Sequence, residues 1–117
     1  MKLIPMLPVQ HLSASVSIYE KLGFTVTRRE DHWGWARLGH GDCEIMLDQS
    51  INQQPSAPRQ SVVYLYPDNI DEYHGQVRVS GLEISDLETT FYGMREFRIN
   101  DPDGNRLWIG QAATPNR

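Results

Sequence analysis

The sequence predicts an α+β fold of two tandem βαβββ modules, which form a curved mixed sheet with helices on its convex side. Two observations predict it. Residues 12–26 resemble residues 70–84, half a chain length later, in their helical spacing of apolar residues and in the glycine that ends it. Each copy follows a short apolar run and precedes two segments that flank a polar, glycine-containing turn. The order strand, helix, three strands therefore occurs twice.

The first module is expected to span residues 1–48. Leu12, Val16 and Tyr19 have helical spacing, and Gly23 ends the predicted helix. Ser13 is of a residue type that can accept bonds from the free N–H groups of a first helical turn. The predicted strands are residues 3–9, the segment beginning at 24–26, and the hairpin of residues 33–38 and 43–48 around the turn 39–42.

The second module is expected to span residues 61–111, and its features match those of the first. Ile70, Tyr73 and Val77 have helical spacing, Gly81 corresponds to Gly23, and Asp71 corresponds to Ser13. The predicted strands are residues 62–66, 82–84, 95–100 and 106–110, the last two around the turn 101–105. Residues 49–60 are interpreted as a linker and residues 112–117 as a frayed tail, within a single domain of residues 1–117.

Composition excludes several classes of protein. With 117 residues the chain fits one hydrophobic core, and its 11 Lys and Arg against 15 Asp and Glu give a formal charge of -4 without a basic cluster, which argues against a nucleic-acid partner. The longest apolar run, residues 62–66, is too short to cross a membrane. The start does not resemble a signal peptide, so a cytoplasmic location is expected. The single cysteine, Cys43, excludes an internal disulfide and is expected to be a small core residue.

Counting outward from each turn predicts which residues share a face of the sheet. In the first hairpin, Trp35 is expected opposite Met46 and Trp33 opposite Asp48, which places indoles and charges on the face away from the helix. In the second hairpin, Phe97 is expected opposite Trp108. A concave face that gathers such rings is typical of a small-molecule pocket. The predicted ligand-binding residues are Trp33, Trp35, Glu44, Met46, Asp48, Tyr64, Phe91, Arg95, Phe97 and Trp108.

Other interpretations of these residues stay open. The tryptophans also suit a core or a dimer interface, and Tyr64, Phe91 and Phe97 also suit a core. Glu44 and Asp48 favour a cationic ligand, but they also suit solvated strand positions, with Glu44 held by Arg37. Because the arginines at 95, 98 and 106 equally favour an anion, the sign of the ligand's charge stays open. The four histidines lack a ligand spacing on one strand face and are interpreted as solvated.

The sequence resembles the vicinal oxygen chelate superfamily, which contains glyoxalase I, extradiol dioxygenases, fosfomycin-resistance enzymes and bleomycin-resistance proteins. The resemblance covers nearly the whole chain. It is strongest in Leu-Pro-Val at 7–9 leading into Ser-Ile-Tyr-Glu-Lys-Leu-Gly-Phe at 17–24, and in Tyr-Gly-Met-Arg-Glu-Phe at 92–97 leading into Asp-Pro-Asp-Gly-Asn at 101–105. These motifs are specific for the fold but do not select an activity within it.

The resemblance also implies where a metal would bind. Metal-using members hold a divalent ion with His or Glu from the first and last strands of each module, and the matching positions here are Ile4, Glu44, Val62 and Trp108, with Ile45 as the alternative to Glu44. One carboxylate does not hold a catalytic divalent ion, which usually needs about three protein ligands. No metal, no other cofactor and no catalytic residue is therefore expected.

The departure from the metal-binding pattern resembles the bleomycin-resistance-like members, which bind ligands in two clefts of a homodimer. The leading hypothesis is a metal-free homodimer that sequesters a planar or aromatic small molecule, with bleomycin-type glycopeptides as one ligand class. Whether the dimer forms by packing or by exchange of halves, and whether antibiotic resistance is the biological role, stay open. Two alternatives remain: a metal-dependent glyoxalase-like lyase or dioxygenase in which Glu44 is joined by His32 or His40, and a protein interaction module with exposed rings.

Overall fold

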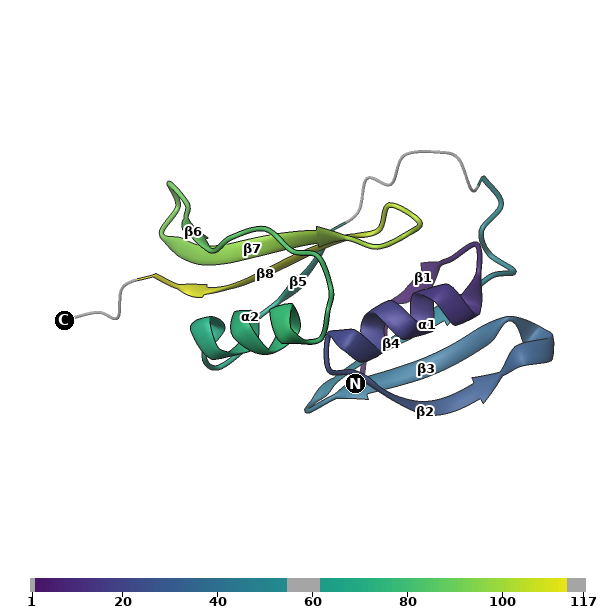
Figure 1. The fold of residues 1–117 in the computed structure, drawn as a ribbon. Helices are drawn as coiled ribbons and strands as arrows, with labels where there is room; N and C mark the ends of the chain where they lie inside the picture. Colours follow the sequence, from purple (N-terminus) through teal and green to yellow (C-terminus); the bar gives the residue numbers. More distant parts are fainter. Residues whose placement is uncertain (1, 55–61, 114–117) are drawn as a thin grey trace. The chain divides into compact units, whose positions relative to one another are not determined.

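The computed structural model describes residues 2–54 and 62–113 (Figure 1). Most of the predicted linker and the end of the predicted tail, residues 55–60 and 114–117, lie outside the described residues. The chain divides into two compact units. The first unit contains Met1–Pro58 with Pro102–Gly104, and the second contains Arg59–Asp101 with Asn105–Arg117.

The first unit contains one α-helix and one four-stranded mixed sheet. The strand order is β1-β4-β3-β2, in which β1 is parallel to β4 and the other pairs are antiparallel. Helix α1 lies across one face of this sheet (Figure 1). The elements are β1 (Met6–Pro8), α1 (Leu12–Lys21), β2 (Thr25–Glu30), the short 3-10 helix η1 (Asp31–Trp33), β3 (Trp35–His40) and β4 (Cys43–Asp48).

The second unit repeats this topology. Its strand order is β5-β8-β7-β6, with β5 parallel to β8, and α2 packs against β7 and β8. The elements are β5 (Val62–Leu65), α2 (Ile70–Val79), β6 (Glu88–Thr89), β7 (Met94–Asn100) and β8 (Arg106–Ala112). The two βαβββ modules predicted from the repeat are therefore confirmed.

The second strand of the second module differs from its prediction. Residues 82–84 are not a strand, and β6 is limited to Glu88–Thr89. The segment before β6 instead contacts β7 and α2, since Ser85 Oγ accepts a hydrogen bond from Arg98 N at 3.5 Å and Ser85 O lies 2.8 Å from His74 Nε2. At the other end of the module, β8 extends to Ala112 and Ala113 N donates to Gly93 O, so residues 112 and 113 belong to the hairpin rather than to a frayed tail.

Both helices end at the predicted glycines. Gly23 has φ +100° and Gly81 has φ +93°, a left-handed backbone that residues with a side chain rarely adopt. At the other end of each helix, the predicted capping residues are wrong. Ser13 and Asp71 lie inside the first turn, and α2 is instead capped by Asn69, whose Oδ1 accepts from Glu72 N at 3.1 Å.

A glutamine at or directly after the last strand of each module accepts a hydrogen bond from the first free N–H group of its helix. Gln49 Oε1 accepts from Leu12 N at 2.7 Å, directly after β4. Gln111 Oε1 accepts from Ile70 N at 2.9 Å, within β8. The two modules thus also share a tertiary contact, in which a glutamine outside the helix accepts from the helix N-terminus.

The core of each unit lies between its helix and the facing side of its sheet. In the first unit, Ala36, Leu38, Ile45 and Leu47 are buried, as predicted for the helix side. Cys43 is the exception, because it pairs with the exposed His40 at the open end of the hairpin and is itself exposed. In the second unit the buried sheet residues are Phe97, Ile99, Leu107 and Ile109, and they lie with the helix residues Ile70 and Val77. No helix within the described residues is long and apolar enough to cross a membrane.

Candidate functional site

The face of each sheet that points away from its helix, here called the open face, carries most of the candidate residues. In the first sheet the hairpin turns at Gly41 and Asp42, so Trp35 pairs with Asp48, Arg37 with Met46 and Gly39 with Glu44. The predicted register was therefore wrong by two residues. Because side chains alternate between faces with a period of two, this shift leaves every predicted face assignment in the hairpin unchanged.

The open face of the first sheet carries an indole and a thioether in contact. Trp35 Nε1 donates to Met46 Sδ at 3.3 Å, and both side chains are partly buried. Trp33 lies in η1 rather than opposite Asp48, which corrects its predicted pairing, yet its ring is 6.3 Å from that of Trp35. The guanidinium carbon of Arg28 lies 5.8 Å and 5.7 Å from the centres of the Trp33 and Trp35 rings, close enough for a cation–π interaction.

The carboxylates of this face already have partners. Glu44 forms an ion pair of 2.9 Å with Lys2, not with Arg37. Asp48 Oδ1 accepts hydrogen bonds from Ser50 N at 2.7 Å and Ser50 Oγ at 2.6 Å. Ile45 is buried on the helix side and therefore does not belong to the open face.

In the second hairpin the predicted pairing was wrong by one residue, which exchanges the faces of β7. Asn100 pairs with Arg106 across the turn, so Trp108 lies opposite Arg98 and Phe97 lies opposite Ile109. The prediction centred the turn between two residues, whereas residues 101–105 form an odd-numbered turn centred on one residue. A one-residue slip moves all side chains of a strand to the other face.

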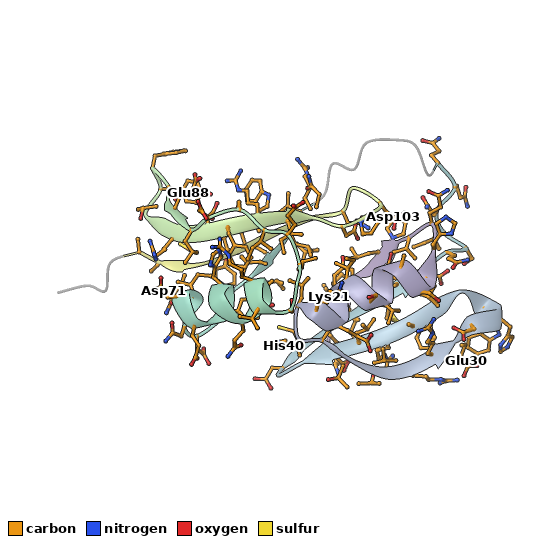
Figure 2. All side chains as sticks on the ribbon, in the orientation of Figure 1. Lys21, Glu30, His40, Asp71, Glu88 and Asp103 are labelled. Carbon is orange, nitrogen blue, oxygen red and sulfur yellow. The ribbon has the colours of Figure 1, made fainter. Side chains whose placement is uncertain are left out.

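Two predicted ligand-binding residues consequently lie on the helix side. Phe97 is 1% exposed and its ring packs against Tyr73 and His74 of α2, at centroid distances of 6.4 Å and 4.8 Å. Arg95 binds Asp71 in the first turn of α2 at 2.8 Å, and this guanidinium holds the pKa of the Asp71 carboxyl below its usual value. Figure 2 labels Asp71 on α2. Phe91 lies in the β6–β7 turn, is 99% exposed and contacts Tyr92.

The open face of the second sheet is an aromatic surface that also carries Arg98 and Arg106. Tyr64 pairs in register with Trp108, and their rings meet edge to face at 6.4 Å. Tyr66, which is 72% exposed, stacks on Tyr64 at 4.7 Å. The guanidinium carbon of Arg98 lies only 3.8 Å from the centre of the Trp108 ring.

The buried carboxylate of Glu96 links three side chains of this unit by hydrogen bonds. Its side chain is 1% exposed and accepts hydrogen bonds from Tyr64 Oη at 2.5 Å, Tyr92 Oη at 2.6 Å and Arg98 Nη2 at 2.9 Å. Burial alone would raise the pKa of Glu96, but these donors outweigh it and hold the pKa below its ordinary value. Burial and the carboxylate together raise the pKa of Tyr64 far above its ordinary value.

Close approach at Gly110 makes this cluster possible. Gly110 pairs with Glu96, and a Cβ atom at Gly110 would lie 2.7 Å from Tyr64 Oη and 2.8 Å from Glu96 Cβ. Glu96, Tyr92 and Gly110 were not among the predicted ligand-binding residues, although Tyr92 and Glu96 lie in the motif at residues 92–97. Only the correct hairpin register would have placed Glu96 on the same face as Trp108. Beside the cluster, a hollow of about 320 Å³ is lined by Ser85, Glu88, Glu96, Phe97 and Arg98 (Figure 2 labels Glu88).

The residues that would bind a metal do not form a ligand set in the described parts of the chain. Among residues 2–54 and 62–113, no group of three or more His, Cys, Asp or Glu is placed to hold an ion. The two histidines that were considered as partners of Glu44 have other neighbours. His32 Nδ1 lies 3.9 Å from Glu30, and the His40 ring packs on Phe24 at 5.4 Å.

The registers also show which positions of the two modules correspond. Met6 pairs with Met46 in the first sheet as Tyr64 pairs with Trp108 in the second. Met46, not Glu44, is therefore the counterpart of Trp108. Neither Met46 nor Trp108 has an ionisable side chain.

Comparison with known proteins assigns the family. The model of the Glyoxalase/Bleomycin resistance protein/Dioxygenase superfamily matches residues 4–109. The chain belongs to this superfamily. No curated protein matches its sequence.

Several solved structures resemble this one over nearly their whole lengths. A bleomycin-binding protein complexed with bleomycin is 25% identical with a TM-score of 0.79, over 95% of this chain and 98% of that one. A bleomycin resistance determinant encoded on the transposon Tn5 is 24% identical with a TM-score of 0.80, over 97% and 99%. Lactoylglutathione lyase from Agrobacterium tumefaciens is 18% identical with a TM-score of 0.70, over 93% and 92%. The fold is thus shared with a bleomycin-binding protein, a bleomycin resistance determinant and a lyase.

Proposed function

We propose that this superfamily member is a metal-free binding protein of the bleomycin-resistance type, which sequesters a planar or aromatic small molecule. The observation that carries the proposal is the chemistry of the open faces. At the equivalent positions Met46 and Trp108 a thioether and an indole occur, and neither can coordinate a hard divalent cation as a carboxylate or imidazole does. Such side chains bind a flat ligand by stacking and burial of apolar area.

The similarity to a bleomycin-binding protein supports this class of ligand. That protein and this chain have the same fold and similar length. Here the rings of Trp33, Trp35 and Trp108 offer partly exposed surfaces, and an indole stacks on flat or cationic groups. A bleomycin-type glycopeptide is therefore the first ligand to test.

Titration of the purified protein with bleomycin and with flat aromatic compounds tests the proposal. Calorimetry and tryptophan fluorescence are expected to show saturable binding at micromolar concentrations. Trp35→Ala is expected to weaken binding by about tenfold or more, since removing a stacked aromatic group typically costs more than 1 kcal/mol at a binding site. Val79→Ala, at an 88% exposed position of α2, is the matched control. The absence of saturable binding would contradict the proposal.

We further propose that the protein acts in the cytoplasm as a homodimer, with both copies contributing to each ligand site. The resemblance to bleomycin-resistance proteins motivates this arrangement. Light scattering is expected to give twice the mass of the 13.4 kDa chain. A monomer that binds the ligand with full affinity would exclude a shared site.

A second candidate is a metal-dependent lyase or oxygenase, which Glu44 favours because its carboxylate lies on the open face. Metal analysis of the purified protein decides between the candidates. Stoichiometric zinc, nickel, manganese or iron that is lost in Glu44→Gln would favour the enzyme.

A further inference from the structure

Arg37 carries a positive charge that no described residue neutralises. Its side chain is partly buried on the open face of the first sheet, and its Nε is buried without a hydrogen-bond partner. Within residues 2–54 and 62–113 no carboxylate lies within ion-pair distance of its guanidinium. A buried N–H donor of a charged group is costly to leave without an acceptor.

A second arginine lies opposite Arg37 on the neighbouring strand. Arg37 on β3 pairs with Arg28 on β2, directly after an irregularity in the pairing. Two positively charged residues are therefore cross-strand neighbours. Arg28 has partners of its own, because it bonds to Glu30 at 3.3 Å and lies over the two indoles. Figure 2 shows Glu30 at the end of β2. Arg37 has no such partner.

The nearby carboxylates on β4 are engaged elsewhere. Arg37 pairs with Met46, so Glu44 and Asp48 are its diagonal neighbours on the same face. Glu44 binds Lys2 at 2.9 Å, and one oxygen of Asp48 accepts both Ser50 donors. Within the described residues neither carboxylate lies within ion-pair distance of Arg37, although Glu44 Oε1 is also buried without a hydrogen-bond partner.

The second module shows what the same position looks like when it is neutralised internally. Arg37 lies opposite Met46 as Arg98 lies opposite Trp108, so Arg37 and Arg98 are equivalent. Arg98 bonds to Glu96 two residues before it, at 2.9 Å. Two residues before Arg37, the equivalent position is Trp35. An indole thus replaces the carboxylate, and the acceptor that Arg98 has within the chain is missing for Arg37.

We propose that Arg37 binds an anionic group of the ligand, a carboxylate or a phosphate, while the adjoining indole of Trp35 packs against the ligand's flat part. This inference rests on the proposed binding of a planar or aromatic small molecule and specifies that molecule as an anion, unlike the cationic bleomycins that serve there as the first test ligand. A guanidinium supplies donors in a fork that matches both anions, and charge-assisted bonds of this kind are among the stronger ones in proteins. The ligand then provides on the first sheet what Glu96 provides on the second.

Four probes with the same ring separate ring binding from charge recognition. They are 2-naphthoate, 2-naphthyl phosphate, 2-naphthylmethylammonium and neutral 2-naphthalenemethanol, each titrated by calorimetry at neutral pH. We expect at least one of the two anions to bind about tenfold or more tightly than the ammonium and the alcohol. The ratio between the two anions identifies the preferred group.

Substitutions at the proposed site test whether Arg37 causes this preference. Arg37→Gln is expected to remove the preference for the anion and to leave binding of the alcohol unchanged. Trp35→Glu places a carboxylate where the second module has Glu96, and it is also expected to remove anion binding. Arg78→Gln, which removes an exposed cation bound to Asp86 on α2, is the control and should change nothing. Arg37→Lys is expected to recover part of the preference, because it restores the charge but not the fork.

A side-chain signal provides a second measurement. The ¹⁵N resonance of the Arg37 Nε–H group, assigned by its loss in Arg37→Gln, is expected to shift on addition of the preferred anion. Equal binding of all four probes, or an anion preference that persists in Arg37→Gln, would overturn the inference while leaving the proposed binding function intact. Lack of binding by either anion would also overturn it, and bleomycin titration then judges the proposed function separately. Dissociation of a dimer by Arg37→Gln would instead show that a second copy supplies the acceptor, and this too would overturn it.

Discussion

Gly110 shows how much depends on a single missing side chain. A Cβ atom there would lie within 2.8 Å of both Tyr64 Oη and Glu96 Cβ, distances that packed atoms do not adopt. Gly110→Ala is therefore expected to lower the free energy of unfolding by about 1–3 kcal/mol, the usual cost of overpacking. Urea denaturation measures this change.

The matched control for this prediction is Gly75, a glycine inside α2. A Cβ at Gly75 would meet nothing within 4 Å, so Gly75→Ala is expected to stabilise the protein by about 0.5–1 kcal/mol through helix propensity. Equal effects of the two substitutions would show that the Glu96 cluster is not tightly packed in solution.

Glu96 makes stability depend on pH. Its folded-state pKa lies below its ordinary value, so the carboxylate stabilises the protein fully above the ordinary pKa of about 4.3, and this contribution is lost as pH falls through the lower folded-state pKa. Glu96→Gln is expected to cost about 1–3 kcal/mol at neutral pH, because Arg98 and two phenols lose a charged acceptor.

Urea denaturation between pH 7 and pH 3 checks this prediction. The difference between wild type and Glu96→Gln should shrink as the pH falls below 4. A difference that is constant over this range would mean that the negative charge of Glu96 contributes nothing.

At the scale of elements, the two glutamines that accept from the helix N-termini are expected to act alike. Gln49→Ala and Gln111→Ala each remove the acceptor of a first-turn N–H group, of Leu12 and Ile70 respectively. We expect each substitution to lower the free energy of unfolding by about 0.5–2 kcal/mol, as for other helix caps. Gln76→Ala, at an exposed position of α2, is the control, and an equal loss there would contradict the capping role.

The hairpins show which element features a sequence can predict. The turn in the first hairpin contains an even number of residues, so a misplaced centre moved the pairing without changing faces. The turn at residues 101–105 is odd-numbered, and there the same method exchanged the faces and misplaced Arg95 and Phe97. Turn chemistry marks where a chain reverses, but the hydrogen bonds between Asp101 and Asn105 decide the register.

At the scale of the whole molecule, the prediction of a single domain concerns cooperativity. Each unit has its own sheet, helix and buried residues. If residues 1–117 fold as one domain, calorimetry should show one unfolding transition with equal calorimetric and van't Hoff enthalpies. Leu38→Ala leaves a cavity at a fully buried position in the first unit. It should then lower the free energy of unfolding of that single transition by about 2–5 kcal/mol.

A second transition that is unaffected by Leu38→Ala would contradict the single-domain prediction. The two units would then unfold separately. Leu107→Ala, in the second unit, provides the reciprocal measurement, because Leu107 is 1% exposed on β8.

The sequence by itself determined the repeat, both helices with their terminal glycines, and the assignment of Trp35, Met46 and Asp48 to one face, because these features follow from local periodicity and glycine conformation. Only the tertiary structure decided the partners of the charged groups. Glu44 binds Lys2, Glu96 is buried beneath two tyrosines, and Arg37 lacks an acceptor among the described residues. The physical reason is that ion pairs and burial join residues far apart in the chain, and a one-residue difference in register changes which of them meet.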